Sequence, residues 1–254
     1  MKTSVIKKHI LEGLAPYVKD YGFKIVKSQF EIVKKDRDRY FRWVFINEKP
    51  LWEDEKLYSL DLWCNFKKIL DVSENIKPKY GVRLINFCAQ MNLLAFKAYV
   101  DGKAELSDKL HFINPIPSSL ILLDRVVFDS AENFKQYRNL PSDTPVFIID
   151  NEDSYKPVVD YLRTLLPYVA MYFDQIDTIE KLDKLYNRLP IQYNPNARWP
   201  DDHACVGLIA AKLVNNPNYD ILKYAYLQYL KDIDYNENGI ENVKDLIDYL
   251  DSPE

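Results

Sequence analysis

The amino-acid sequence predicts an α+β fold, in which an N-terminal helix and an antiparallel β-meander sheet are followed by a mostly helical C-terminal part. Three observations indicate this class. Apolar residues recur at helical spacing over residues 4–20, and they alternate with polar residues over residues 58–66, which is the clearest strand pattern in the chain. After Asp150 the apolar spacing becomes helical.

The first 66 residues are predicted to form one helix and three strands. Gly22 is a stop signal for the helix, and Pro16 inside the pattern is expected to kink it or end it early. In residues 23–32 the apolar positions change from odd to even, which indicates a bulge near Ser28. The charged residues 36–38 are a predicted turn before the return strand.

The middle of the chain alternates between strand and helix signals. Residues 82–100 fit either a strand or a helix, and residues 120–128 fit a buried strand or the start of a helix. Asp101-Gly102 is typical of a hairpin turn. Residues 131–138 are predicted to form a short helix, and residues 146–150 a short strand that leads into a longer helix.

The C-terminal part is predicted to be helical throughout. An apolar stripe covers residues 158–173, and a second helix starts at Thr178. Residues 202–215 and 218–232 form a predicted helix pair, and a short helix over residues 242–250 follows.

We expect a boundary between two units at residues 190–200. This segment holds three prolines and two asparagines, a composition typical of a linker. Residues 1–190 would then form the α+β domain, and residues 200–254 a small helical subdomain.

The bulk composition excludes several classes of function. The chain has 254 residues and a formal net charge of −4, which offers no general attraction to nucleic acid. It has no run of 18 apolar residues, so we expect no membrane span. The three cysteines, at 64, 88 and 205, are odd in number and widely spaced, which does not favour a disulfide framework. We therefore expect a cytoplasmic protein.

The local motifs of common catalytic sites are missing from the sequence. Its 6 glycines form no phosphate-binding loop and no serine elbow, and its histidines and cysteines lack zinc spacing. Asp202, His203 and Cys205 are neighbours, but residues i and i+2 of a helix point apart. We interpret them as a helix start with Cys205 in the core; a site assembled from distant residues stays open.

Residues 234–245 resemble a calcium-binding loop of the EF-hand type. Oxygen-bearing side chains stand at alternate positions, and Gly239 permits a sharp turn. The candidate ligands are Asp234, Asn236, Asn238 and Asp245. Few of them are carboxylates, so the predicted affinity is low. The alternative is an ordinary Asn-Gly turn between helices, in which the same side chains act as caps.

Trp63 is a candidate for an interaction surface. In the predicted strand 58–66 it lies on the face opposite the apolar residues, together with polar side chains. A tryptophan on a polar sheet face is either covered by another element or exposed to a partner. Of the two, the predicted helices favour the covered position.

Two segments resemble a broad group of uncharacterised bacterial α+β domains. Residues 14–45, LAPYVKDYGFKIVKSQFEIVKKDRDRYFRWVF, resemble their start, in which a helix leads through a Gly-Phe-Lys step into a meander. Residues 173–187, FDQIDTIEKLDKLYN, are similar to their helical ends. Some of these domains occur beside polymorphic toxins and are suspected immunity proteins. The resemblance rests on packing patterns and implies no functional residue.

Three hypotheses about function follow. The first is a non-enzymatic interaction protein, immunity-like in the sense of the resemblance, that binds a protein partner through an acidic, aromatic surface. The second is an enzyme with a site assembled from distant residues. The third is a weak calcium binder at residues 234–245. No cofactor besides calcium is expected.

Overall fold

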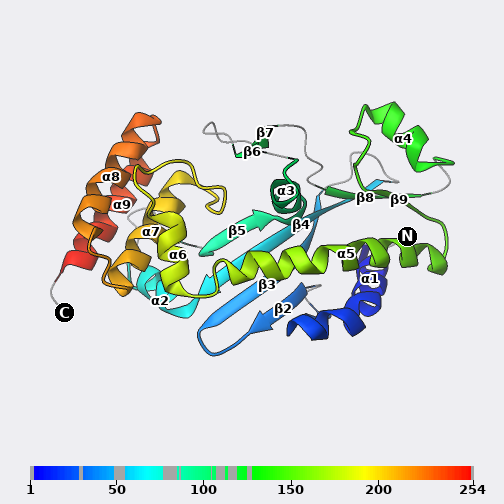
Figure 1. Cartoon of the computed structure of the whole chain (residues 1–254), viewed down its shortest axis with the longest axis horizontal. Coiled ribbons are helices and arrows are strands. Elements are labelled where there is room, and N and C mark those ends of the chain that lie inside the picture. The colour runs from blue at the N-terminus through cyan, green and yellow to red at the C-terminus, as the bar shows by residue number, and fades with distance from the viewer. Residues whose placement is uncertain are drawn as a thin grey trace.

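The computed structural model describes residues 3–28, 31–48, 55–76, 85, 87–103, 105–106, 112–113, 119–124 and 128–252. It confirms the α+β class: an N-terminal helix, a sheet that begins as an antiparallel meander, and a mostly helical C-terminal part (Figure 1). None of the helices within these residues has the length and apolar character needed to span a bilayer.

The chain begins with α1 (Thr3–Val18), η1 (Lys19–Tyr21), β1 (Lys24–Val26), β2 (Glu31–Lys35), β3 (Arg39–Glu48), β4 (Glu55–Phe66), α2 (Lys67–Asn75), β5 (Ala89–Asn92) and α3 (Leu93–Val100). It continues with β6 (Glu105–Leu106), β7 (Phe112–Ile113), β8 (Ser119–Asp124), α4 (Ala131–Arg138), β9 (Val146–Ile149), η2 (Glu152–Ser154), α5 (Tyr155–Asp174), α6 (Ile179–Tyr186), α7 (Pro200–Leu213), α8 (Tyr219–Asp232) and α9 (Glu237–Asp251).

Strand β4 is the centre of the main sheet. The meander β1–β2–β3 pairs with one of its edges, and every pair in it is antiparallel. The other edge is shared, because β8 pairs with the first half of β4 and β5 with the second half. Strand β9 lies parallel to β8, and α4 connects the two, so the sheet is mixed at that end.

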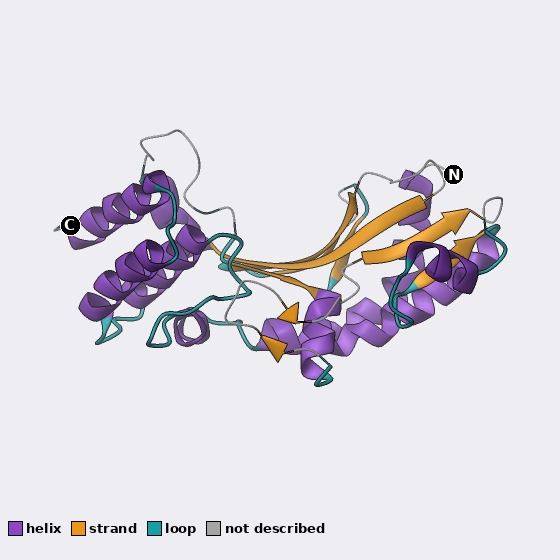
Figure 2. Cartoon of the chain, turned by 90° about the horizontal axis from the view of Figure 1, so that it is seen from above, coloured by secondary structure: helices purple, strands orange, loops and turns teal. Residues whose placement is uncertain are grey.

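One face of the sheet carries the main hydrophobic core. Alternate residues of β3 and β4 point into it, and Trp43, Tyr58 and Leu62 are completely buried there. Helices α1, α3 and α5 pack against this face, and Figure 2 shows helices gathered on one side of the curved sheet. Helix α4 covers a smaller cluster on the opposite face, where Phe134 meets Ile121.

Two local features, a predicted bulge and a predicted hairpin turn, differ from what the sequence indicates. The stretch around Ser28 is not a bulged strand, because β1 and β2 are separate antiparallel strands and Val26 pairs with Glu31. Asp101-Gly102 does not join two strands but ends helix α3. Gly102 has φ +68°, and the amide of Lys103 donates to the carbonyl of Ala98, a helix-terminating arrangement that favours glycine.

The segment predicted to be a linker, residues 190–200, is packed into the protein. Ile191, Asn194 and Asn196 are buried, and the Asn196 carbonyl accepts a 2.8 Å hydrogen bond from the amide of Gln90 in β5. One cluster of buried apolar residues runs from the sheet into α7, α8 and α9. Independent folding of residues 200–254 stays a prediction.

Candidate functional site

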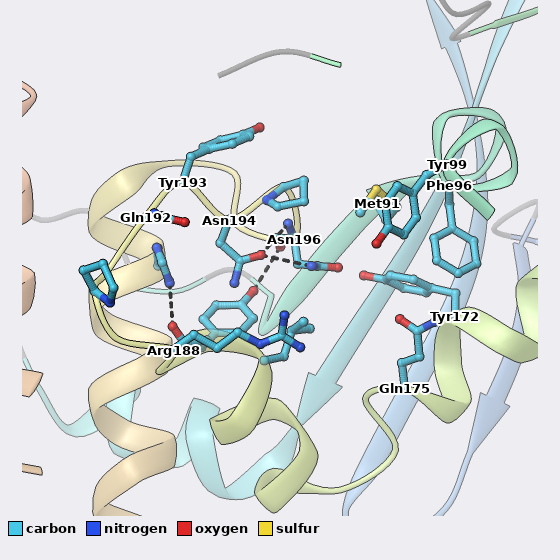
Figure 3. A pocket seen from close by; sticks show the side chains of 15 residues that line it. Met91, Phe96, Tyr99, Tyr172, Gln175, Arg188, Gln192, Tyr193, Asn194 and Asn196 are labelled. Carbon is cyan, nitrogen blue, oxygen red and sulfur yellow. Dashed lines mark hydrogen bonds between the residues drawn. The ribbon is translucent and has the colours of Figure 1, made fainter. Parts of the chain in front are cut away.

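A cavity of about 300 Å³ lies where the sheet, α3 and the end of α5 meet the segment from α6 to α7 (Figure 3). Its lining residues are Met91, Phe96, Tyr99, Tyr172, Gln175, Leu185, Tyr186, Arg188, Pro190, Gln192, Tyr193, Asn194, Pro195, Asn196 and His203. Aromatic rings and side-chain amides dominate the lining. Such a mixture of apolar walls and a few polar groups is typical of binding sites for small ligands or inserted side chains.

The wall formed by residues 194–196 is fixed by its own hydrogen bonds. Asn194 Oδ1 accepts 3.0 Å bonds from both the amide and the side chain of Asn196. The Tyr186 hydroxyl lies 2.7 Å from the Cys88 carbonyl and 3.0 Å from the Asn196 carbonyl, and either can accept its proton. These bonds tie the α6–α7 segment to Cys88, directly before β5, and place its side chains around the cavity.

Three buried polar atoms on the lining residues have no hydrogen-bond partner among the residues that the structure describes. They are the Tyr172 hydroxyl, Asn194 Nδ2 and His203 Nδ1, and their residues are 1%, 7% and 2% exposed. A buried polar group without a partner costs about 1–3 kcal/mol, so such groups are rare and point to an absent ligand or to water. In Figure 3, Asn194 and Tyr172 lie on opposite sides of the cavity, and the Tyr172 hydroxyl points toward Asn196.

The bonding of His203 determines what its free nitrogen can do. Nε2 lies 3.0 Å from the Tyr186 carbonyl oxygen, which can only accept, so Nε2 carries the proton. Burial lowers the pKa of His203 to about 4, against the smaller opposite effect of that hydrogen bond, so the ring is neutral at pH 7. The free Nδ1 of His203 is therefore a hydrogen-bond acceptor.

Among the described lining residues, Arg188 contributes the one formal charge. Its Nε donates a 3.4 Å bond to the Lys184 carbonyl, and no carboxylate in the described part of the chain forms an ion pair with it. In Figure 3 its guanidinium group points toward the cavity. The lining is thus weakly cationic in a chain whose net charge is −4.

The polar side chains of the lining can hydrogen-bond a ligand between apolar walls. No carboxylate, cysteine or serine is among the lining residues within the described part of the chain. Cys205 of α7 is buried in the hydrophobic core. Burial raises the pKa of its thiol well above the usual value, so the thiol is not an activated nucleophile. His203 stands between the rings of Tyr186 and Tyr226. Asp202, His203 and Cys205 lie near the start of α7, which begins at Pro200. Asp201 Oδ1 accepts a 3.1 Å bond from the amide of Asp202, and the Asp202 carboxyl is hydrogen-bonded to the backbone of Trp199.

The four candidate calcium ligands do not share one loop. Helix α9 begins at Glu237, so Asn238 and Asp245 are helical. Asn236 is the N-cap and accepts a 2.9 Å bond from the amide of Gly239, while Asp234 has φ +53° in the preceding turn. Within the described residues, no group of three or more His, Cys, Asp or Glu side chains could hold a metal ion. The predicted twelve-residue loop is wrong as a conformation, and calcium binding itself stays a prediction.

Trp63 is half-buried on the face of the sheet opposite the main core. The guanidinium group of Arg42 lies over its ring at 4.3 Å from the centroid, and the Phe87 ring packs beside it at 5.2 Å. Arg42 is held in turn by Glu31, at 3.3 Å. Two neighbouring side chains thus cover much of the indole, and its role in an interaction surface stays a prediction.

The sequence interpretation missed the cavity because its key residues carry no local motif. Tyr172 belongs to the apolar stripe of α5, and Asn194 stands in a segment whose prolines and asparagines are typical of a linker. One signal could have drawn attention to the site. Residues 190–200 also contain a tyrosine, a tryptophan and an isoleucine, which free linkers rarely carry.

Comparison with known proteins adds no assignment: no family model, no curated protein and no solved structure matches the chain.

Proposed function

We propose that this chain is a non-enzymatic interaction protein and that a protein partner inserts a short segment into the cavity between α3, α5 and the α6–α7 segment. The observation that carries the proposal is the set of three buried, unpartnered polar groups between aromatic walls. A partner that forms hydrogen bonds to these groups would remove the cost of leaving them buried without partners, and this gain would stabilise the complex.

The surroundings of the cavity favour a protein over a small metabolite. Exposed large apolar residues lie at or near the lining residues in sequence, on three of the segments that form the cavity. They are Tyr99 and Val100 on α3, Met171 on α5, and Leu189 and Trp199 on the α6–α7 segment. Aromatic side chains and methionine are enriched in protein interfaces. The partner would be a toxin if the resemblance to toxin-associated domains extends to function, and the cytoplasm would be the place of their encounter.

A display library of random peptides tests the proposal. Selection uses the immobilised chain, and each selected peptide is then measured against two variants, Gln175→Trp and Asp174→Trp. Gln175 is an exposed lining residue, so the indole would occupy the mouth of the cavity, whereas exposed Asp174 lies next to it outside the lining. We expect peptides that bind the wild type and Asp174→Trp but not Gln175→Trp. Selected peptides that bind all three alike would refute the proposal.

A further inference from the structure

The unpartnered groups of the cavity differ in the bonds that they lack. Asn194 Nδ2 is a donor, and its amide oxygen is already used by Asn196. His203 Nδ1 is an acceptor, because the ring is neutral with its proton on Nε2. The Tyr172 hydroxyl can donate or accept. The ligand must therefore both accept and donate a hydrogen bond.

These requirements exclude most side chains as the best occupant. A carboxylate only accepts hydrogen bonds, so its oxygen lone pairs would be repelled by the lone pair of His203 Nδ1. An indole only donates and would leave Asn194 Nδ2 without an acceptor. A phenyl ring would leave all the unpartnered groups unsatisfied, at about 1–3 kcal/mol each. A hydroxyl group or a carboxamide can do both.

The walls decide between these two. Phe96, Tyr99, Tyr172 and Tyr186 surround the cavity with aromatic rings, and Met91 adds a thioether. Aromatic pairs gain about 0.5–1.5 kcal/mol beyond the burial of their area, and sulfur also packs favourably against ring edges. A carboxamide brings no ring to these contacts. A phenol brings both the ring and a hydroxyl that donates and accepts.

We propose that the cavity recognises the phenol side chain of a tyrosine in the partner's inserted segment; this inference rests on the proposed function. The phenol hydroxyl donates to His203 Nδ1 and accepts from Asn194 Nδ2. The hydroxyl of Tyr172, on the other side of the cavity in Figure 3, is left for the peptide group that carries the ring. That second polar group favours a tyrosine residue over a free phenol.

Methionine methyl resonances of the whole chain report on the cavity directly. The sequence has only 3 methionines; Met91 lines the cavity and is 7% exposed, whereas Met171 is exposed and is not among the lining residues. With methyl-labelled methionine, the chain is titrated with N-acetyltyrosinamide, N-acetylphenylalaninamide and 4-methylphenol. We expect a saturable shift of the Met91 signal with N-acetyltyrosinamide, and binding of N-acetylphenylalaninamide at least tenfold weaker.

Two variants separate the two ends of the site. Asn194→Asp keeps the oxygen that accepts from Asn196 and removes the amide donor, so it should weaken both phenolic probes about tenfold. Tyr172→Phe removes a hydroxyl that has no partner, so the fold is retained. It should weaken N-acetyltyrosinamide several-fold and leave 4-methylphenol unchanged. Thermal unfolding of each variant checks the fold.

The outcomes distinguish this inference from the proposed function. Equal affinity for the tyrosine and phenylalanine probes, or an unmoved Met91 signal with every probe, would overturn the phenol inference. If display then still yields peptides without tyrosine that Gln175→Trp abolishes, the proposed function stands alone. If 4-methylphenol binds as tightly as N-acetyltyrosinamide and display yields no cavity-dependent peptide, the site holds free phenols and the proposed function fails.

Discussion

Two adjacent side chains at the start of α7 have pKa values shifted in opposite directions. Burial, followed by the charge of Asp201, raises the pKa of Asp202 to about 7. Burial lowers the pKa of His203 to about 4. Both residues therefore favour their neutral forms, as expected where charged groups lose water without gaining an ion pair. The neutral imidazole is what makes His203 an acceptor in the cavity.

We predict that Asp202→Asn stabilises the chain increasingly as pH rises. The folded pKa of about 7 lies above the ordinary value of 3.8, so the folded state binds a proton that the unfolded state releases. Stability is therefore lost between about pH 4 and pH 7. From pH 5 to pH 8 the advantage of Asp202→Asn should grow by roughly 2 kcal/mol in urea unfolding. Asp248→Asn, at an exposed position, is the control, and a constant advantage would contradict the burial of Asp202.

His203 should stay neutral down to about pH 5. Because its folded pKa lies below the ordinary 6.5, its contribution to stability is lost as pH falls from about 6.5 through about 4, by at most about 3 kcal/mol. The Cε1 proton signal of His203, assigned through His203→Gln, should keep its chemical shift between pH 8 and pH 5.5. A midpoint near 6.5 in that titration would show a solvated ring and remove the acceptor from the cavity.

At the scale of elements, helices α7 and α8 approach each other closely at Gly207. A Cβ at this position in α7 would lie 2.2 Å from the hydroxyl of Tyr226 in α8 and 2.7 Å from Asn187 Oδ1. The same hydroxyl lies 2.8 Å from Asn187 Oδ1 and 3.0 Å from the Tyr186 carbonyl. The absence of a side chain at Gly207 thus permits the bonds that position the end of α6.

Gly207→Ala should destabilise the chain by about 1–3 kcal/mol, the usual cost of overpacking a core. Chemical unfolding measures the change. Gly207→Ala should destabilise the Tyr226→Phe variant less than it destabilises the wild type, because the nearest clashing atom, the Tyr226 hydroxyl oxygen, is then gone. Strictly additive losses would contradict the proposed contact.

The early start of helix α9 predicts that residues 234–245 do not bind calcium. Asn236 caps the helix and the following residues are helical, so the oxygens of a binding loop do not converge there. We expect millimolar calcium to give no heat in calorimetric titration and no change in melting temperature. Saturable heat that Asp234→Ala abolishes would mean that this helix unwinds to bind the ion.

Local sequence signals predicted where several helices begin and end, whereas the packing of residues 190–200 depends on tertiary contacts that those signals do not contain. Ser130 caps α4 and Thr178 caps α6 through bonds to the amides three residues on, as their sequence contexts indicate. Gly22 has φ +76° and ends the first helical segment, which continues past Pro16. The packing of residues 190–200 depends on β5, more than a hundred residues away, so composition alone indicated a linker.

At the scale of the whole molecule, the cavity lies where the sheet and the C-terminal helices meet. The buried apolar cluster is continuous across this junction, and the Tyr186 hydroxyl lies within hydrogen-bond distance of both Cys88, directly before β5, and Asn196 in the α6–α7 segment. We therefore expect one cooperative thermal transition, with equal calorimetric and van't Hoff enthalpies. Two resolved transitions would instead support a separate subdomain at residues 200–254.

Insertion of a partner segment into the cavity is best measured as the affinity of a display-selected peptide for the cavity variants. Calorimetry would compare the wild type with Gln175→Trp and with its neighbour control Asp174→Trp. We expect one peptide per chain, an unchanged Kd for Asp174→Trp and a Kd raised at least a hundredfold for Gln175→Trp, about 2.7 kcal/mol. An equal Kd for all three proteins would mean that the peptide binds elsewhere on the molecule and would refute insertion into the cavity.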